Sequence, residues 1–148
     1  MEKIRPATIL LVEDDPGDQK LIKVSLKNQK IANELYVVGS GEEAMDFLYH
    51  RGNYSAETTL PDLILLDLKM PGMGGKEFLR RIKQDEKMKK IQVVILTSSD
   101  SEKDILDSYN LQASGYVKKP VELEDFRRVV KEIEAYWFII CKLPPKEE

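Results

Sequence analysis

Five short runs with strand character, each followed by a segment with helical character, constrain the fold of this chain more than any other feature. The runs lie at residues 8–12, 34–39, 62–67, 91–97 and 114–120. The stretches "TILLV" in the first and "LILL" in the third are continuously apolar, which is typical of strands that are covered on both faces. Strands that alternate with helices form right-handed crossovers, and hence a parallel sheet with helices on both sides. We therefore expect an α/β fold with a doubly wound, five-stranded parallel sheet.

The segments between the runs carry helix signals. In "DDPGD", Asp15 is placed to cap a helix and Pro16 occupies its first position, where a missing N–H costs nothing. We expect helices from Pro16 onward, over residues 40–52, within 74–90, over 101–111, and from 121 into the tail.

Size and composition favour one folded domain over residues 1–148. Hydrophobic residues make up 42% of the chain and charged residues 33%, which is ordinary for a globular protein. The net charge of −3 argues against a nucleic-acid-binding surface. One cysteine, Cys141, allows no intrachain disulfide, and with the single His50 it cannot build a zinc site, so a reducing, cytoplasmic setting fits. No apolar stretch reaches the roughly 20 residues that span a membrane.

Chemically useful side chains gather where the predicted strands end. Glu13 and Asp14 follow the first run, Asp67 ends the third, Thr97 ends the fourth and Lys119 the fifth. Ligands of open α/β sheets bind at the carboxyl ends of the strands, which lie along one edge. We therefore expect these five side chains at one site, whereas Asp15 and Asp18 are expected only to cap a helix.

Carboxylates brought this close together repel one another. At about 4 Å and an effective dielectric constant of about 20, each like-charged pair costs about 4 kcal/mol, so the acids take up protons or a cation lies among them. Only oxygen ligands are on offer, which favours Mg²⁺, an ion that shares its shell readily with phosphate. Lys119 can supply a positive charge to that phosphate and Thr97 a hydroxyl donor. Asp67 remains as the nucleophile that would form an acyl phosphate.

Two other functions use a similar arrangement of strands. A flavodoxin-like FMN site needs a phosphate-binding loop after the first strand, but that loop here is "EDDPGD", which repels phosphate unless a metal intervenes. A phosphatase with an aspartate nucleophile carries a second acid two residues later, where this chain has Lys69. The Walker pattern G-x-x-x-x-G-K-[ST] does not occur.

Four motifs together resemble the receiver domain of two-component response regulators, the CheY-like family. They are "LLVEDD", "LLDLKMPGMGG", "VVILTSS" and "GYVKKP", in family order and spacing over nearly the whole chain. The resemblance implies a flavodoxin-like (CheY-like) sheet with strand order 2-1-3-4-5. It also implies that the domain accepts a phosphoryl group, and that it is no enzyme beyond its own phosphotransfer and dephosphorylation.

The same resemblance assigns a role to each matching position. Asp67 matches the phosphoacceptor, and the Lys69 backbone carbonyl matches a metal ligand. Asp14 matches the direct metal ligand and Glu13 a ligand acting through water, although the three acids in "VEDD" leave Asp14 and Asp15 as an alternative pair. The remaining matches are the active-site lysine and two switch residues, at Lys119, Thr97 and Tyr116. The glycines at 72, 74 and 75 are expected to let the loop after Asp67 adapt to metal and phosphate.

A narrower resemblance points to stand-alone regulators that partner phytochrome-type histidine kinases. It rests on "VEDDPGD", "AMDFLYHRG", "DSYNL" and "EAYWFIICKLP". A sensor histidine kinase is the implied partner. The chain stops shortly after its last predicted helix, so we expect no output domain. The output would be a switched protein-interaction surface, a relay step, or a sink for phosphate.

The last predicted helix is more apolar than core packing requires. Residues 135–141, "AYWFIIC", are apolar all round rather than along one stripe. Such an excess suggests a partner surface rather than a packed tail. We expect a homodimer or a kinase contact there, made by Tyr136, Trp137, Phe138 and Ile140.

Overall fold

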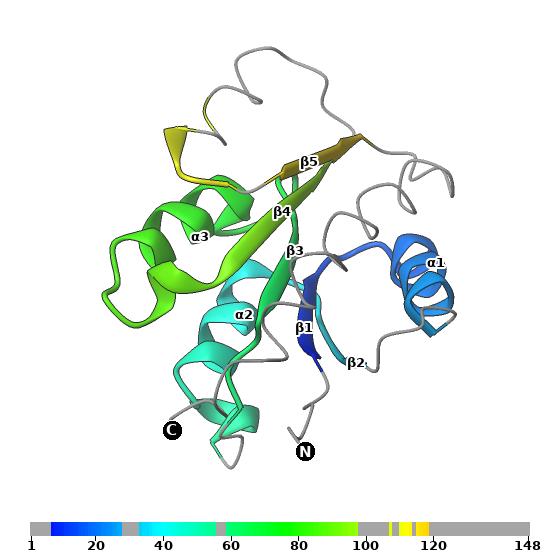
Figure 1. Cartoon of the computed structure of the whole chain (residues 1–148), viewed down its shortest axis with the longest axis horizontal. Coiled ribbons are helices and arrows are strands. Elements are labelled where there is room, and N and C mark those ends of the chain that lie inside the picture. Colours follow the sequence, from blue (N-terminus) through cyan, green and yellow to red (C-terminus); the bar gives the residue numbers. More distant parts are fainter. Residues whose placement is uncertain are drawn as a thin grey trace, which may run out of the picture.

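A computed structural model gives the fold and describes residues 7–27, 33–55, 59–97, 107, 110–113 and 115–118. Five strands form one sheet: β1 Ala7–Val12, β2 Asn33–Val38, β3 Leu63–Asp67, β4 Gln92–Thr97 and β5 Gly115–Lys118. Their order is β2-β1-β3-β4-β5, and all neighbours pair in parallel (Figure 1). The predicted fold class and strand order are confirmed.

Helices cover both faces of the sheet. α2 (Gly41–Leu48) and α3 (Gly74–Lys83) lie on one face, and α1 (Pro16–Lys27) lies on the other (Figure 1). Two short 3₁₀ turns, η1 (Gly52–Tyr54) and η2 (Met88–Lys90), follow α2 and α3. Of the predicted helices, those at 101–111 and from 121 onward lie outside the described residues, apart from a few positions.

The central strands send alternate side chains into two hydrophobic cores. Leu10 and Ile64 pack with Phe47 and Phe78 from α2 and α3, whereas Ile9 belongs to the core under α1. β3 is buried along its whole length, as a strand covered on both faces must be. Such a strand is a rigid support for the residue at its tip, Asp67.

The end of α2 differs from the prediction. The helix ends at Leu48 and not at residue 52, because His50 adopts a left-handed conformation with φ 56°. The Arg51 amide donates to the Asp46 carbonyl at 2.9 Å, and the His50 amide donates to the Phe47 carbonyl at 3.4 Å. These two bonds are those of a Schellman C-cap, which usually contains glycine rather than histidine.

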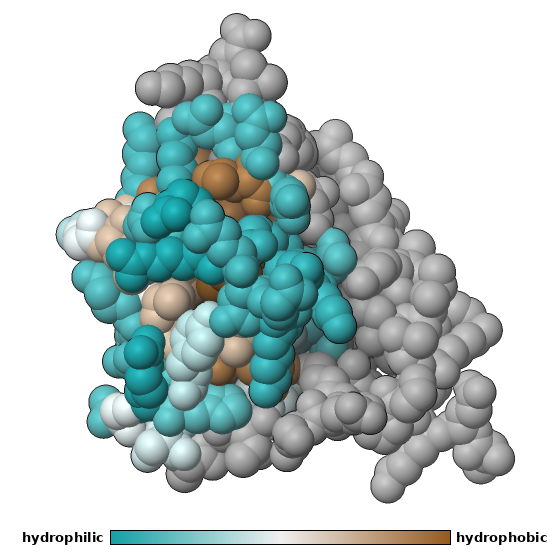
Figure 2. Space-filling view, turned by 90° about the vertical axis from the view of Figure 1, so that its left-hand side faces the viewer, coloured by the Kyte–Doolittle hydropathy of each residue, from teal (hydrophilic) through white to brown (hydrophobic). Residues whose placement is uncertain are grey.

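The surface on the side of α3 is mainly hydrophilic, with smaller hydrophobic areas (Figure 2). The exposed Arg80 and Arg81 both bind the Glu77 carboxylate, so the basic residues of α3 are paired with an acid on a solvated face of the helix. Among the described residues, no helix has the length and apolar character needed to cross a membrane.

Candidate metal centre

Three carboxylates converge at the carboxyl ends of β1 and β3. The two strands are neighbours, and Val12 lies opposite Leu66, so the residues that follow, Glu13 and Asp67, lie side by side. One oxygen each from Glu13, Asp14 and Asp67 lies within 4.8 Å of the other two. Glu13 is 0% and Asp67 3% exposed, whereas Asp14 is exposed. The predicted meeting of these three acids is what the structure shows.

Asp15 has a different place, as the sequence predicts. Its carboxylate accepts a hydrogen bond from the Asp18 amide at 2.8 Å and so caps α1. The Glu13 carboxylate in turn accepts from the Asp15 amide at 3.1 Å, and the Glu13 carbonyl accepts from the Gln19 side chain at 2.6 Å. The start of α1 therefore fixes Glu13 from both sides, and the acids grouped with Asp67 are Glu13 and Asp14.

The chain after Asp67 turns back on the tip of β3. The Lys69 amide donates to Asp67 Oδ1 at 3.1 Å, and the Gly75 amide donates to the Leu68 carbonyl at 3.1 Å. A Cβ atom at Gly75 would lie 2.3 Å from the Asp67 carbonyl oxygen, which is too close for any side chain. Gly75 thus serves close packing of backbone on backbone, while Gly72 and Gly74 supply positive φ angles.

The donor set of the cluster suits a hard divalent cation. It consists of carboxylate oxygens, which Mg²⁺ prefers to nitrogen or sulfur ligands. Charges about 4 to 5 Å apart repel by about 3 to 4 kcal/mol per pair at an effective dielectric constant of about 20. A bound divalent cation would offset this repulsion, and two of the three acids are buried where water does so poorly.

The other predicted site residues are placed only in part. Thr97 ends β4 at the same edge, one residue beyond Leu96, which pairs with Asp67. Tyr116 lies in β5 opposite Ile95. The side chains of Thr97 and Tyr116 lie outside the described part of the chain, as do Lys119 and the predicted interface at Tyr136, Trp137, Phe138 and Ile140. The roles of these residues remain predictions.

One contact near the site was not anticipated from the sequence. The Glu42 carboxylate, at the start of α2, accepts a hydrogen bond from the Met73 amide in the loop after Asp67. The two residues are 31 positions apart, and a surface glutamate in "SGEEA" carries no signal for such a contact.

Comparison with known proteins defines the class to which this fold and acid cluster belong. The sequence model of the family described as "Response regulator receiver domain" matches residues 9–131. The chain belongs to the response regulator receiver domain family.

Comparison with individual relatives of similar length makes the resemblance more specific than the family alone. Response regulator Rcp1 of Synechocystis is 41% identical over 139 residues, which cover 94% of each chain. The solved Mn²⁺-bound form of Rcp1 superposes with a TM-score of 0.80, at 41% identity, over 95% of this chain and 100% of that one. The phosphorylated cyanobacterial phytochrome response regulator RcpA gives a TM-score of 0.81 and 40% identity over the same shares of the two chains. The predicted resemblance to phytochrome-associated regulators is confirmed.

Proposed function

We propose that this receiver domain accepts a phosphoryl group on Asp67 from a sensor histidine kinase, with Mg²⁺ held by Glu13, Asp14 and Asp67. The observation that supports it most is the convergence of the three carboxylates within 4.8 Å at the tips of β1 and β3. The metal bound to Rcp1 and the phosphorylated state of RcpA give further support. A phosphoacceptor explains the cluster better than an FMN site, because these acids would repel the flavin phosphate.

Asp67 is the acid best suited to act as the nucleophile. It stands at the end of a fully buried strand, and the Lys69 amide holds one of its oxygens at 3.1 Å. Asp67 attacks the phosphorus of a phosphohistidine in line with the phosphorus–nitrogen bond. The new oxygen–phosphorus bond gives an acyl phosphate, and the bond electrons return to the imidazole, which takes a proton from water.

The remaining residues of the proposed site assist this transfer. Asp14, Glu13 and the Lys69 backbone carbonyl would hold the metal together with Asp67. When bound, Mg²⁺ neutralises charge on the transferring group. Lys119 and Thr97 bind the phosphoryl oxygens, and the movement of Thr97 lets Tyr116 shift, which changes an interaction surface. A phosphate sink or a relay intermediate would use the same chemistry but would not need a switched interaction surface. In each case, the domain would catalyse only its own phosphotransfer and dephosphorylation.

Mass spectrometry of the intact protein tests the proposal directly. After incubation with acetyl phosphate and Mg²⁺, the wild type should gain the mass of one phosphoryl group, and Asp67→Asn should not. Asp62→Asn is the matched control because it changes the same residue type at the opposite end of the same strand, and it should still be phosphorylated. An Asp67→Asn variant that gains the same mass as the wild type would refute the assignment.

The proposed partners are a phytochrome-type histidine kinase in the cytoplasm and a second copy of the chain. The kinase type rests on the resemblance to RcpA, and the homodimer rests on the apolar residues Tyr136, Trp137, Phe138 and Ile140. In sedimentation, the wild type should run as a dimer and Trp137→Glu as a monomer. An unchanged mass for the variant would remove Trp137 from the interface.

A further inference from the structure

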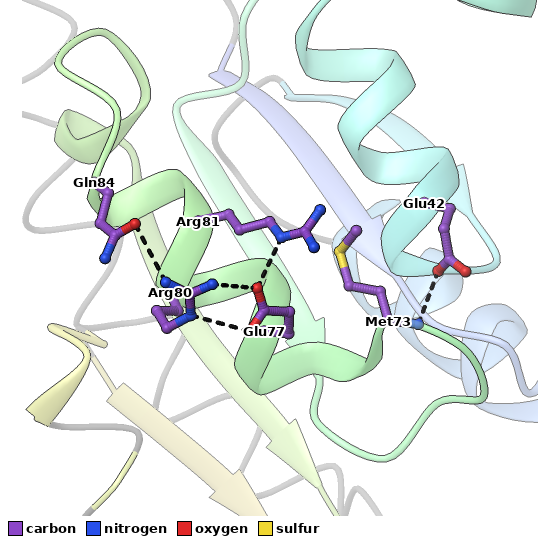
Figure 3. A network of polar contacts seen from close by, with 6 residues as sticks. All are labelled: Glu42, Met73, Glu77, Arg80, Arg81 and Gln84. Carbon is purple, nitrogen blue, oxygen red and sulfur yellow. Dashed lines mark hydrogen bonds and ion pairs between the residues drawn. The ribbon is translucent and has the colours of Figure 1, made fainter.

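Glu42 joins the start of α2 to the loop that follows Asp67. The Met73 amide donates to Glu42 Oε1 at 3.2 Å (Figure 3). The neighbouring Gly72 approaches so closely that a Cβ atom there would lie 2.4 Å from Glu42 Oε2. Next to Glu42 in α2, a Cβ atom at Gly41 would lie 3.4 Å from the Met73 side chain. The contact therefore involves two successive residues of the loop and two of the helix.

The helix that follows this loop has no cap of its own. Met73 precedes α3 with φ −55° and ψ −37°, and its side chain makes no capping hydrogen bond. By contrast, α2 is capped by Ser40, whose hydroxyl accepts from the Glu43 amide at 3.0 Å. The Glu42 carboxylate supplies an acceptor at the start of α3 from a neighbouring helix, where a negative charge also interacts favourably with the helix dipole.

The loop between Asp67 and α3 is fixed at its two ends. At the inner end, Gly75 packs on the Asp67 carbonyl and donates to the Leu68 carbonyl at 3.1 Å. At the outer end, Glu42 holds Met73. Gly72, directly before Met73, has φ +78°, a conformation that few other residues adopt. Lys69 lies in the stretch between these two attachments, which are made at Leu68 and at Met73.

We infer that Glu42 is a positioning residue for the metal centre. By accepting from Met73 and lying against Gly72, it would fix the loop that carries Lys69. The Lys69 carbonyl would help to hold the metal in the proposed function, whereas Glu42 is not one of the proposed ligands. This inference rests on the proposed function. A residue that merely capped α3 would change the stability of the fold but not the affinity for a divalent cation.

The affinity of the full-length protein for Mn²⁺, measured by water-proton relaxation, tests the role. Glu42→Ala should weaken binding roughly tenfold, as the loss of a residue that orients metal ligands does. Glu42→Gln retains an acceptor for the Met73 amide and should bind within about twofold of the wild type. Glu86→Ala is the matched control, because this exposed glutamate binds only a surface lysine, Lys89, in the contacts described, and it should leave the affinity unchanged.

Metal-free protein provides a second measurement. In Glu42→Ala, the Met73 amide should exchange with solvent faster, and the amide resonance of Lys69 should shift, whereas Glu42→Gln should restore both. A change at Met73 with no change at Lys69 would mean that the loop does not transmit the contact, and the inference would fail.

Two glycine variants keep the inference testable if Glu42→Ala does not fold. Gly72 and Gly74 both have positive φ, but a Cβ atom at Gly72 would push Glu42 aside, whereas one at Gly74 meets nothing within 4 Å. Gly72→Ala should therefore weaken Mn²⁺ binding by a larger factor than Gly74→Ala. Equal factors would contradict the role of Glu42.

The outcomes separate this inference from the function on which it rests. A wild type that binds Mn²⁺ and is phosphorylated, with Glu42→Ala binding equally well, would overturn the positioning role alone. Equal weakening in Glu42→Ala and Glu42→Gln would assign the effect to charge at a distance and would also overturn it. A wild type that neither binds Mn²⁺ nor accepts phosphate would remove the proposed function itself.

Discussion

The two aspartates that bracket β3 perform opposite tasks. At the amino end, Asp62 pairs with Thr8 at the start of β1: the Thr8 amide donates to Asp62 Oδ2 at 2.9 Å, and the Asp62 amide donates to the Thr8 carbonyl at 2.8 Å. At the carboxyl end, Asp67 lies among other acids, within 4.8 Å of Glu13 and Asp14. The same residue type therefore stabilises the fold at one end of the strand and forms the candidate site at the other.

Other acids of the described structure resemble Asp62 rather than Asp67. Asp85 accepts from the Tyr49 hydroxyl at 2.6 Å and from two backbone amides, and the pKa of its carboxyl is lowered mainly by the bond from Tyr49. Glu43 accepts from the Gly39 amide at 2.8 Å and from the Tyr54 hydroxyl. A carboxylate surrounded by donors indicates a structural role, whereas carboxylates gathered against one another indicate a site for a cation.

The largest effect on stability is expected at the amino end of β3. Asp62→Ala leaves the partly buried Thr8 amide without its acceptor, so the free energy of unfolding should fall by about 2 kcal/mol. Asp62→Asn retains a carbonyl oxygen and should lose less. Urea denaturation measures both. If the two variants were equally stable, the charge of Asp62 rather than its hydrogen bond would matter, and the comparison with Asp67 would lose its basis.

A smaller change of opposite sign is expected at the carboxyl end. Asp67→Asn removes one charge from the acid cluster, so in the presence of a chelator the variant should be more stable than the wild type by about 1 kcal/mol. Adding Mg²⁺ should raise the melting temperature of the wild type and barely change that of the variant. A loss of stability in the chelator would show that the charge of Asp67 makes favourable interactions that outweigh the repulsion.

The grouping of the three acids could be predicted because its sequence signals are local. An apolar run that ends in an acid marks both a buried strand and its tip, and the carboxyl ends of neighbouring parallel strands must meet. Glu13, Asp14 and Asp67 could therefore be grouped without knowledge of any distance. The cap at Asp15 was equally readable, because the acid directly precedes Pro16.

The features that were missed depend on local backbone conformation or on contacts between segments that are far apart in the sequence. The bond from Met73 to Glu42 joins two segments that approach only after the sheet has formed. α2 ends early because His50 adopts the left-handed backbone conformation, which at the end of a helix is usually occupied by glycine. The glycines after Asp67 were read as a source of adaptability, but Gly75 is needed because no side chain fits between α3 and β3.

The two tyrosine–carboxylate bonds give a pH-dependent effect that is confined to alkaline conditions. Burial, followed by the bond to Asp85, raises the pKa of Tyr49 from 10.0 to about 12, and burial with the bond to Glu43 does the same for Tyr54. Because the pKa is higher in the folded state, this stabilisation is complete below pH 10 and is lost as the pH rises from about 10 to 12.

Thermal denaturation against pH tests this effect. Tyr49→Phe should be less stable than the wild type at neutral pH, and the difference should vanish toward pH 12. When tyrosinate formation is followed by absorbance against pH, the variant should show one fewer tyrosine that ionises near pH 12. A constant difference across this range would mean that ionisation of the Tyr49 hydroxyl does not change the stability of the fold. Asp85 would then not belong with Asp62 among the acids that stabilise the fold through their donors.

The smallest effect is expected at Glu77, on the exposed face of α3 (Figure 3). Hydrogen bonds from Arg80 and Arg81 lower the pKa of Glu77 from 4.5 to about 2. Because this pKa is lower in the folded state, the stabilisation is present above pH 4.5 and is lost as the pH falls toward 2. Glu77→Gln should therefore lower stability slightly at neutral pH, with the difference disappearing in acid and in high salt, because exposed ion pairs are screened.

Combining this change with Asp67→Asn separates the two kinds of acid. Glu77 stabilises the fold through its arginine partners and Asp67 opposes it through its acidic neighbours, so the two substitutions should change stability in opposite directions and add. Denaturation of both single variants and the double variant at low salt provides the measurement. A clear departure from additivity would show that the exposed face of α3 is coupled to the acid cluster. Glu77 could then no longer be classed as a purely structural acid, separate from Asp67.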